Sequence, residues 1–158
     1  MPLDNLREAD AGLDPDRLPD LATRTPVILF KLGTWTPDDD DVLPRPGYGF
    51  RPDMSSQELY HSVRAWWVID PNRASRYAYA VAVAVAGGVT RGAWVINQAT
   101  WRSIDGRKYG RAARRWAFEG SPVTAAVAHE LVHRRIAIER PDGGNVFGRG
   151  GVIAYWPR

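Results

Sequence analysis

Two groups of residues in this 158-residue sequence have the types and spacing that chemistry requires. The first is the HExxH motif at residues 129–133, whose two histidines lie four residues apart and would share one face of a helix. Such a pair binds zinc in hydrolases, with the glutamate as general base. A third ligand would have to be Glu139 or Asp142, and two arginines directly after the motif would repel a dication. We expect an ordinary amphipathic helix and no metal site, with a zinc-dependent hydrolase as an alternative.

The second group combines tryptophan with arginine. Four of the seven Trp lie between residues 59 and 101, and 19 of the 21 basic residues are Arg, which grips phosphate with two donors and stacks on bases. Residues 1–58 hold 6 Lys and Arg against 12 Asp and Glu, whereas residues 59–158 hold 15 against 6. This basic region points to a polyanionic partner.

Aromatic rings that stack on a base and arginines that hold phosphates are the usual components of a nucleic-acid site. We predict phosphate contacts from Arg64, Arg73, Arg76, Arg91, Arg114 and Arg115. We predict a modified-base pocket from Trp66, Trp67, Tyr77, Trp94 and Trp101. Core packing explains any one of these Trp equally well. We expect Trp66 to be the exposed one, because Trp67 beside it faces the core.

Hydrophobic periodicity indicates the elements that position these residues. From Tyr77 to Val85, Tyr and Val alternate with Ala, which predicts a strand with large side chains on one face and methyl groups on the other. Gly87 and Gly88 end the strand, and residues 89–96 are its predicted hairpin partner. We expect a helix to pack on the shallow alanine face.

A helix begins at a capping box, with Ser55 as N-cap and Glu58 three residues later. The apolar residues of this helix extend to Trp67. The helix must end before Pro71, because Pro71 lies in a predicted turn. A second helix is expected from Ser121, as N-cap, to about residue 133. Further strands are predicted at residues 26–32, 114–119, 135–139 and 152–156, and loops at 33–53, 97–110 and 141–151.

These elements predict an α+β fold, a small mixed and partly closed β-barrel with two or three flanking helices. We assign it to residues 26–158, after an acidic N-terminal arm over residues 1–25. Four consecutive Asp at residues 38–41 lack the alternate spacing of a calcium loop, so we expect a solvated acidic loop.

The sequence lacks the motifs that are typical of several classes of protein. The chain has no Cys, which excludes disulfides and thiol nucleophiles. No nucleotide-binding loop or nucleophile elbow occurs, so we expect neither a cofactor nor catalysis. There is no run of eighteen apolar residues and no signal peptide, so we expect a cytoplasmic protein without membrane contact.

Several blocks, in order, resemble the domain that follows a GIY-YIG nuclease domain in many bacterial proteins. They are PVILFKL, MSSQELYHSVRAWW, RASRYAYAVAVAVAGGVTRGAWVI, RRWAFEG and GRGGVIAYW, with a lone Trp between the third and fourth. At six positions the amino acid is the one found at the matching position of the family: Arg64, Trp67, Tyr77, Gly88, Trp101 and Trp116. The nuclease half is absent from this sequence, and Gly151-Val152 replaces the family's Asn-Pro, so cleavage is not expected.

The free-standing arrangement resembles an actinobacterial protein that binds 5-methylcytosine DNA. This resemblance implies a PUA- or SRA-like barrel that flips the modified base out of double-stranded DNA and holds it, and a nucleoid-associated location. Arg and Trp serve RNA as well as DNA, so a PUA-like RNA-binding module is a second alternative.

Overall fold

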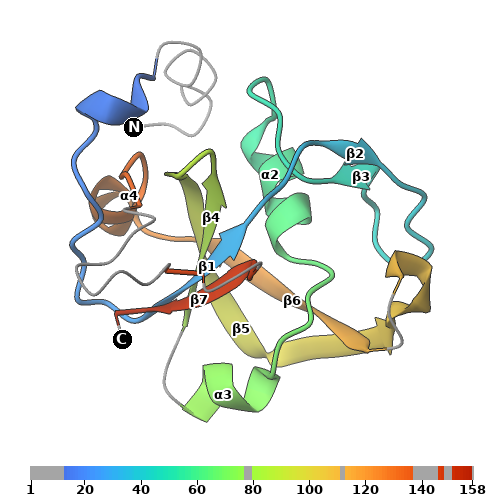
Figure 1. The fold of residues 1–158 in the computed structure, drawn as a ribbon. Helices are drawn as coiled ribbons and strands as arrows, with labels where there is room; N and C mark the ends of the chain where they lie inside the picture. Colours follow the sequence, from blue (N-terminus) through green and yellow to red (C-terminus); the bar gives the residue numbers. More distant parts are fainter. Residues whose placement is uncertain (1–12, 77–79, 111–112, 137–145, 148–150, 158) are drawn as a thin grey trace.

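The computed structural model of the chain describes residues 13–76, 80–110, 113–136, 146–147 and 151–157. Within these residues the fold is mixed α+β, as predicted, and centres on one five-stranded sheet. In spatial order the strands are β6 (Arg114–Pro122), β5 (Val89–Asp105), β4 (Val81–Ala86), β1 (Val27–Lys31) and β7 (Ile153–Trp156) (Figure 1). β1 and β4 are parallel, and the other neighbours are antiparallel.

The edge strands β6 and β7 do not pair with each other, so the sheet is open within the described residues. The remaining elements are a two-stranded sheet, three α-helices and two short 3-10 helices. They are β2 (Thr36–Pro37), β3 (Gly47–Tyr48), α2 (Ser56–Val63), α3 (Pro71–Arg76), α4 (Ala125–Leu131), η2 (Pro15–Arg17) and η3 (Gly106–Tyr109). None of the helices described is long and apolar enough to cross a membrane.

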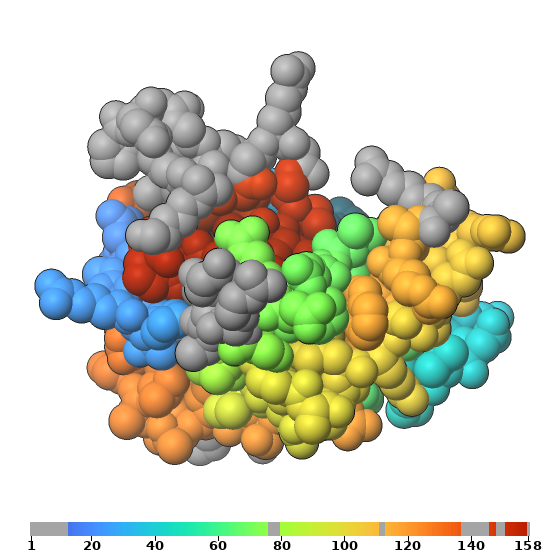
Figure 2. Space-filling view, turned by 90° about the horizontal axis from the view of Figure 1, so that it is seen from below, coloured from blue at the N-terminus to red at the C-terminus, as the bar shows by residue number. Residues whose placement is uncertain are grey.

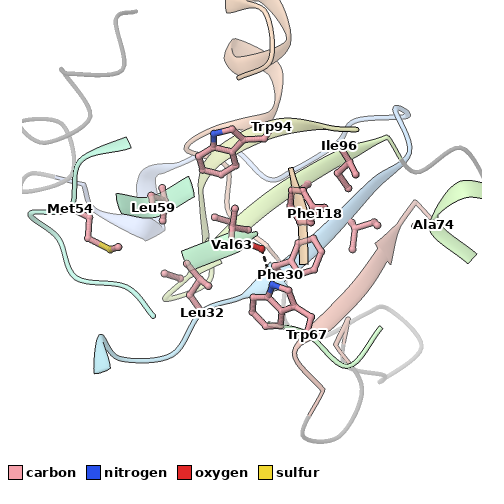
Figure 3. Packing of buried hydrophobic residues seen from close by; sticks show 14 residues of the cluster. Phe30, Leu32, Met54, Leu59, Val63, Trp67, Ala74, Trp94, Ile96 and Phe118 are labelled. Atoms are coloured by element: carbon pink, nitrogen blue, oxygen red, sulfur yellow. Dashed lines mark hydrogen bonds between the residues drawn. The ribbon is translucent and has the colours of Figure 1, made fainter. Parts of the chain in front are cut away.

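The alternating segment forms the centre of the sheet, as its period of two predicts. All six residues of β4 are buried, and the two sets of side chains belong to different hydrophobic clusters. Val83 packs in a cluster with Leu131 of α4, whereas Ala84 packs with Leu59 and Val63 of α2. The helix expected on the alanine face is therefore α2. In Figure 1 it lies on the opposite side of β4 from α4, and Figure 3 shows its residues Leu59 and Val63 in the core cluster.

Strand β5 is much longer than its predicted span of residues 89–96. It continues to Asp105 because β6 pairs with it over its second half, with a bulge between Asn97 and Arg102. The prediction of a loop over residues 97–110 is therefore wrong for residues 97–105, which belong to β5. Its polar composition is explained by exposure, since many side chains of this half of the strand reach solvent.

Two helix predictions need correction at their ends. α2 has the predicted capping box at Ser55 but ends at Val63, and the chain then turns away so that Trp67 forms a backbone bridge with Trp116 of β6. The second predicted helix does not start at Ser121. β6 runs to Pro122 and α4 follows with Thr124 as its N-cap. An edge strand tolerates Pro because one side of its backbone needs no partner.

The predicted turn near Pro71 is instead the short helix α3. Part of the predicted N-terminal arm packs on the domain, since Leu21 is buried and its N–H donates to the carbonyl of Arg135 at 2.9 Å. Of the strand predicted at residues 135–139, Arg135 forms isolated bridges, and residues 137–139 lie outside the described part of the chain.

Candidate binding pocket

A pocket of about 710 Å³ lies where the end of β1, the β3 strand, the segment after α2, η3 and β6 meet. Its volume is in the range of small-molecule sites. Its aromatic lining residues are Tyr48, Trp66, Trp67 and Tyr109. Its charged lining residues are Lys31, Asp38, Arg45, Lys108 and Arg115. Such a lining can stack a planar ring and attract an anion.

Glycine lets β3 come close enough to place Tyr48 at this pocket. Gly49 has φ +92°, in the left-handed region, and a Cβ atom there would clash with the carbonyl oxygen of Thr34. A glycine is therefore required directly after Tyr48. Tyr48 is 38% exposed, which leaves ring surface available to a ligand.

A buried ion pair fixes the wall of the pocket. The Arg45 Nε and Asp40 Oδ2 atoms are 2.7 Å apart, and their side chains are 1% and 2% exposed. Trp66 Nε1 donates to the same carboxylate at 2.9 Å, and Arg45 Nη1 donates to the carbonyl of Ala65 at 2.8 Å. The acidic loop is thereby tied to the segment after α2. The expectation of a solvated loop is wrong for Asp40.

The charge of Asp40 is stabilised by its hydrogen bonds. Burial alone would raise the pKa of its carboxyl, but donors from two backbone N–H groups, Arg45 and Trp66 outweigh burial and lower the pKa to about 2. Asp40 is therefore ionised at neutral pH and holds the Trp66 ring in place.

A second cluster of polar side chains lies nearer the surface. Asp38 accepts a hydrogen bond from Tyr109 Oη at 3.1 Å and pairs with Lys108 Nζ at 3.2 Å. The Arg115 guanidinium carbon lies 5.1 Å from the centre of the Tyr109 ring. Burial is the main reason why the pKa of Tyr109 is raised, so it stays a neutral phenol.

The pocket has an excess of positive charge. Asp40 neutralises Arg45, and Asp38 neutralises Lys108. Lys31 and Arg115 form no ion pair with the acidic residues that the structure describes. These two cations come from strands β1 and β6 and can act on an anionic ligand.

The structure brings two of the five predicted pocket aromatics together. Trp66 and Trp67 both line the pocket, but they are only 4% and 9% exposed. The expectation of an exposed Trp66 is wrong, because its N–H is bound by Asp40 and its ring packs with Leu43 and Ala117. Trp67 Nε1 donates to the carbonyl of Val63 at 2.7 Å (Figure 3). Both rings therefore form part of the wall.

The other predicted aromatics lie elsewhere. Trp94 is buried in the core cluster of Figure 3 and does not line the pocket. Trp101 lines a second pocket of about 470 Å³ with Trp116, where Gln98 accepts its Nε1 hydrogen bond at 2.7 Å. Residues of α3 and β5 line this second pocket, and Figure 2 shows the face on which these two elements lie side by side. Tyr77 lies outside the described residues.

The predicted arginines do not converge on one site. Arg115 lines the larger pocket, whereas Arg64 is 7% exposed and donates from Nε to the carbonyl of Phe118 at 3.0 Å. The guanidinium carbons of Arg73 and Arg91 lie over aromatic rings, 3.9 Å from Tyr155 and 4.7 Å from Phe50. Exposed Arg114 bonds Ser103 at 3.0 Å. The side chain of Arg76 lies outside the described part of the chain.

Sequence reasoning missed several lining residues. They are Lys31, Asp38, Tyr48, Arg45, Ser62, Lys108 and Tyr109. The run of Asp at residues 38–41 and the basic segment around Lys108 were visible signals, but their pairing across 69 to 71 positions of sequence was not. Tyr48 belongs to a strand of two residues, which has no periodicity to detect.

The HExxH segment does not have the geometry that the zinc motif needs. α4 ends at Leu131, and His133 lies beyond it with φ 57° and its N–H donating to Thr90 at 2.8 Å. Glu130 accepts a hydrogen bond from Thr23 Oγ1 at 2.5 Å. No cluster of three His, Cys, Asp or Glu suited to a metal ion occurs among the residues described. In this structure Glu130 joins the N-terminal segment to α4.

Comparison with known proteins finds no match among family models, curated proteins or solved structures. What the pocket binds must therefore be inferred from the residues that line it.

Proposed function

We propose that this protein is a non-catalytic reader of double-stranded DNA that contains 5-methylcytosine, and that its pocket holds the flipped modified base. The observation that carries the proposal is the larger pocket, about 710 Å³ in volume, in which four aromatic residues lie beside two cations without acidic partners in the described residues. Aromatic surface suits a base, and positive charge suits the phosphates around it.

The free-energy cost of flipping a base and the free energy gained by stacking it on an aromatic ring are of comparable size. Flipping a base out of a duplex costs roughly a few kcal/mol. Stacking on an aromatic side chain returns about 1–3 kcal/mol. The Tyr48 and Tyr109 rings are 6.2 Å apart at 78°, so they touch edge to face and leave no parallel slot between them. A base would stack on one exposed ring, and the partly exposed Tyr48 is the better platform.

The polar groups of the pocket suit the edge of a cytosine. Its exocyclic amino group is a donor, and a carboxylate is the usual acceptor for it. Asp38 supplies such a carboxylate within the pocket wall. The exposed Arg73 and Arg114 lie outside the pocket, where they can hold phosphates of the flanking strands.

The resemblance to the domain that follows GIY-YIG nucleases supports the same function. The partly closed PUA- or SRA-like barrel and the nucleoid-associated location are parts of this proposal. Two features of the described sheet favour curvature: β5 carries a bulge, and Trp67 adds a backbone pair to the free edge of β6. Bulges and strand stagger are what curl a sheet toward closure.

The test is a competition binding experiment across a salt series. The probes are a duplex with cytosine, the same duplex with 5-methylcytosine, and a matching RNA. We expect the methylated duplex to bind about four times more tightly than the unmethylated one, because one buried methyl group contributes about 0.8 kcal/mol. Affinity should fall steeply with salt. Tighter binding of RNA would instead support the RNA-binding module, and binding of none of the probes would refute a nucleic-acid function.

A further inference from the structure

Two polar atoms of pocket-lining residues have no hydrogen-bond partner in the described part of the chain. They are Ser62 Oγ and Arg115 Nε. Among the described residues, four buried side-chain nitrogen or oxygen atoms have no hydrogen-bond partner. The other two belong to Arg51 and His61, which do not line the larger pocket. Ser62 is 1% exposed, so bulk water does not satisfy its hydroxyl. A buried polar group without a partner is costly, and its presence in a native fold requires an explanation.

The Ser62 hydroxyl makes no hydrogen bond within the described part of the fold. A serine inside a helix commonly donates to the carbonyl four residues earlier, and Ser62 lies in α2 without such a bond. Arg115 is held by other atoms of the same side chain. Its Nη1 donates to the carbonyl of Trp66 at 3.2 Å, and its guanidinium lies over the Tyr109 ring. Its Nε, which is a donor, is the buried atom of this side chain that has no partner among the described residues.

We propose that Ser62 and Arg115 bind the polar edge of the ligand inside the pocket, an inference that rests on the proposed function. Arg115 Nε can only donate, so the ligand must present an acceptor to it, such as a ring carbonyl or a ring nitrogen. The Ser62 hydroxyl can complete a second hydrogen bond in either direction. The ligand part that enters is therefore a base edge rather than a purely apolar group.

Trp66 and Asp38 favour a base over a phosphate group at this position. The indole of Trp66 offers apolar contact to a ring, and the Asp38 carboxylate can accept from a base amino group, a donor that a phosphate lacks. Both unpaired atoms are covered in the free protein, so the ligand reaches them only after local side-chain movement. A rotation of Ser62 about χ1 breaks no hydrogen bond, because its hydroxyl has none with the described residues.

The experiment measures stability and affinity in the same variant. For Ser62→Ala we expect the melting temperature of the free protein to be unchanged or higher, because an unsatisfied hydroxyl is removed. Affinity for the methylated duplex should fall about 3- to 10-fold. Ser121→Ala, at the exposed end of β6, is the control and should change neither. A lower melting temperature in Ser62→Ala, or an unchanged affinity, would overturn the inference.

Arg115→Lys separates the Nε hydrogen bond from the charge. The substitution keeps a cation and loses the planar donor, so we expect about 10- to 100-fold weaker binding of the methylated duplex at an unchanged salt dependence. Arg135→Lys, which can keep its ion pair with Asp20 outside the pocket, is the matched control and should bind normally. Equal affinity of Arg115→Lys and wild type would contradict the assignment.

A small probe separates failure of this inference from failure of the proposed function. If the wild type binds neither duplex, the DNA-reader proposal fails, and free 2′-deoxycytidine at millimolar concentration decides about Ser62 and Arg115. We expect it to raise the melting temperature of the wild type and not of the two variants. No rise in the wild type, an equal rise in all three, or a rise caused by inorganic phosphate instead would overturn the base-edge assignment.

Discussion

The HExxH segment and the acidic loop at residues 38–41 are the two most conspicuous short motifs of the sequence, and the structure uses them in opposite ways. The first matches a catalytic pattern, yet its helix ends before His133 and its Glu130 bonds Thr23. The second matches no pattern, yet it places Asp40 in a buried ion pair and Asp38 in the pocket wall. A motif therefore acquires its chemistry from partners that are distant in sequence.

The largest effect should come from breaking the buried pair of the acidic loop. Asp40→Asn leaves Arg45 buried without a counter-charge and weakens the bond to Trp66 Nε1. Removal of one partner of a buried pair costs roughly 3–5 kcal/mol. We expect that loss in the free energy of unfolding, measured by urea denaturation. Asp41→Asn, in the same loop but exposed, should change it by less than about 0.5 kcal/mol. Similar effects of the two substitutions would show that the loop is solvated after all.

The same pair predicts a dependence of stability on pH. The pKa of Asp40 is lowered from 3.8 to about 2 in the folded protein, so protonation favours the unfolded state. The stabilisation of about 2 kcal/mol is complete above roughly pH 4 and is lost as the pH falls through about 2. We expect Asp40→Asn to remove this part of the acid transition, as measured by urea denaturation between those pH values. An unchanged profile in the variant would assign the transition to other carboxyl groups.

Tyr48, which lines the pocket together with the acidic loop residue Asp38, should affect DNA binding rather than stability. Tyr48 is 38% exposed, so we expect Tyr48→Ala to cause little loss of stability and about 10-fold weaker binding of the methylated duplex. Tyr48→Phe keeps the ring and should bind nearly as the wild type does. Fluorescence anisotropy with the labelled duplex measures both. Full affinity in Tyr48→Ala would move the stacking surface to another residue, and Tyr109→Ala would then be the next variant.

Local pattern was enough to predict the centre of the fold. The alternation over β4 depends only on neighbouring residues, and the capping box at Ser55 is complete within four residues. The ends of elements depend on distant partners. α2 stops at Val63 because the chain beyond it pairs with β6, and β5 continues to Asp105 for the same reason. No local propensity encodes either event.

The candidate site was predictable only in its residue types. Trp66 and Trp67 were identified as pocket residues, but their role as buried walls follows from Asp40 and Val63, whose carboxylate and carbonyl accept the two indole N–H groups. Ser62 gave no signal, since a serine between apolar helix residues resembles any other polar position. Ser62 stands out because it is buried and its hydroxyl has no partner among the described residues, which are properties of the three-dimensional fold.

The smallest effect is expected at the HExxH segment. His133→Ala should lower the free energy of unfolding by less than about 1 kcal/mol and leave DNA binding unchanged, because His133 lies beyond α4 and does not line the larger pocket. Metal analysis of the purified protein, and thermal unfolding with zinc or with a chelator, measure the alternative directly. The chelator should not shift the melting temperature. If zinc copurifies at one ion per chain and His133→Ala abolishes it, α4 must extend through His133 in solution. The two motifs would then both be functional, and the contrast between them would no longer hold.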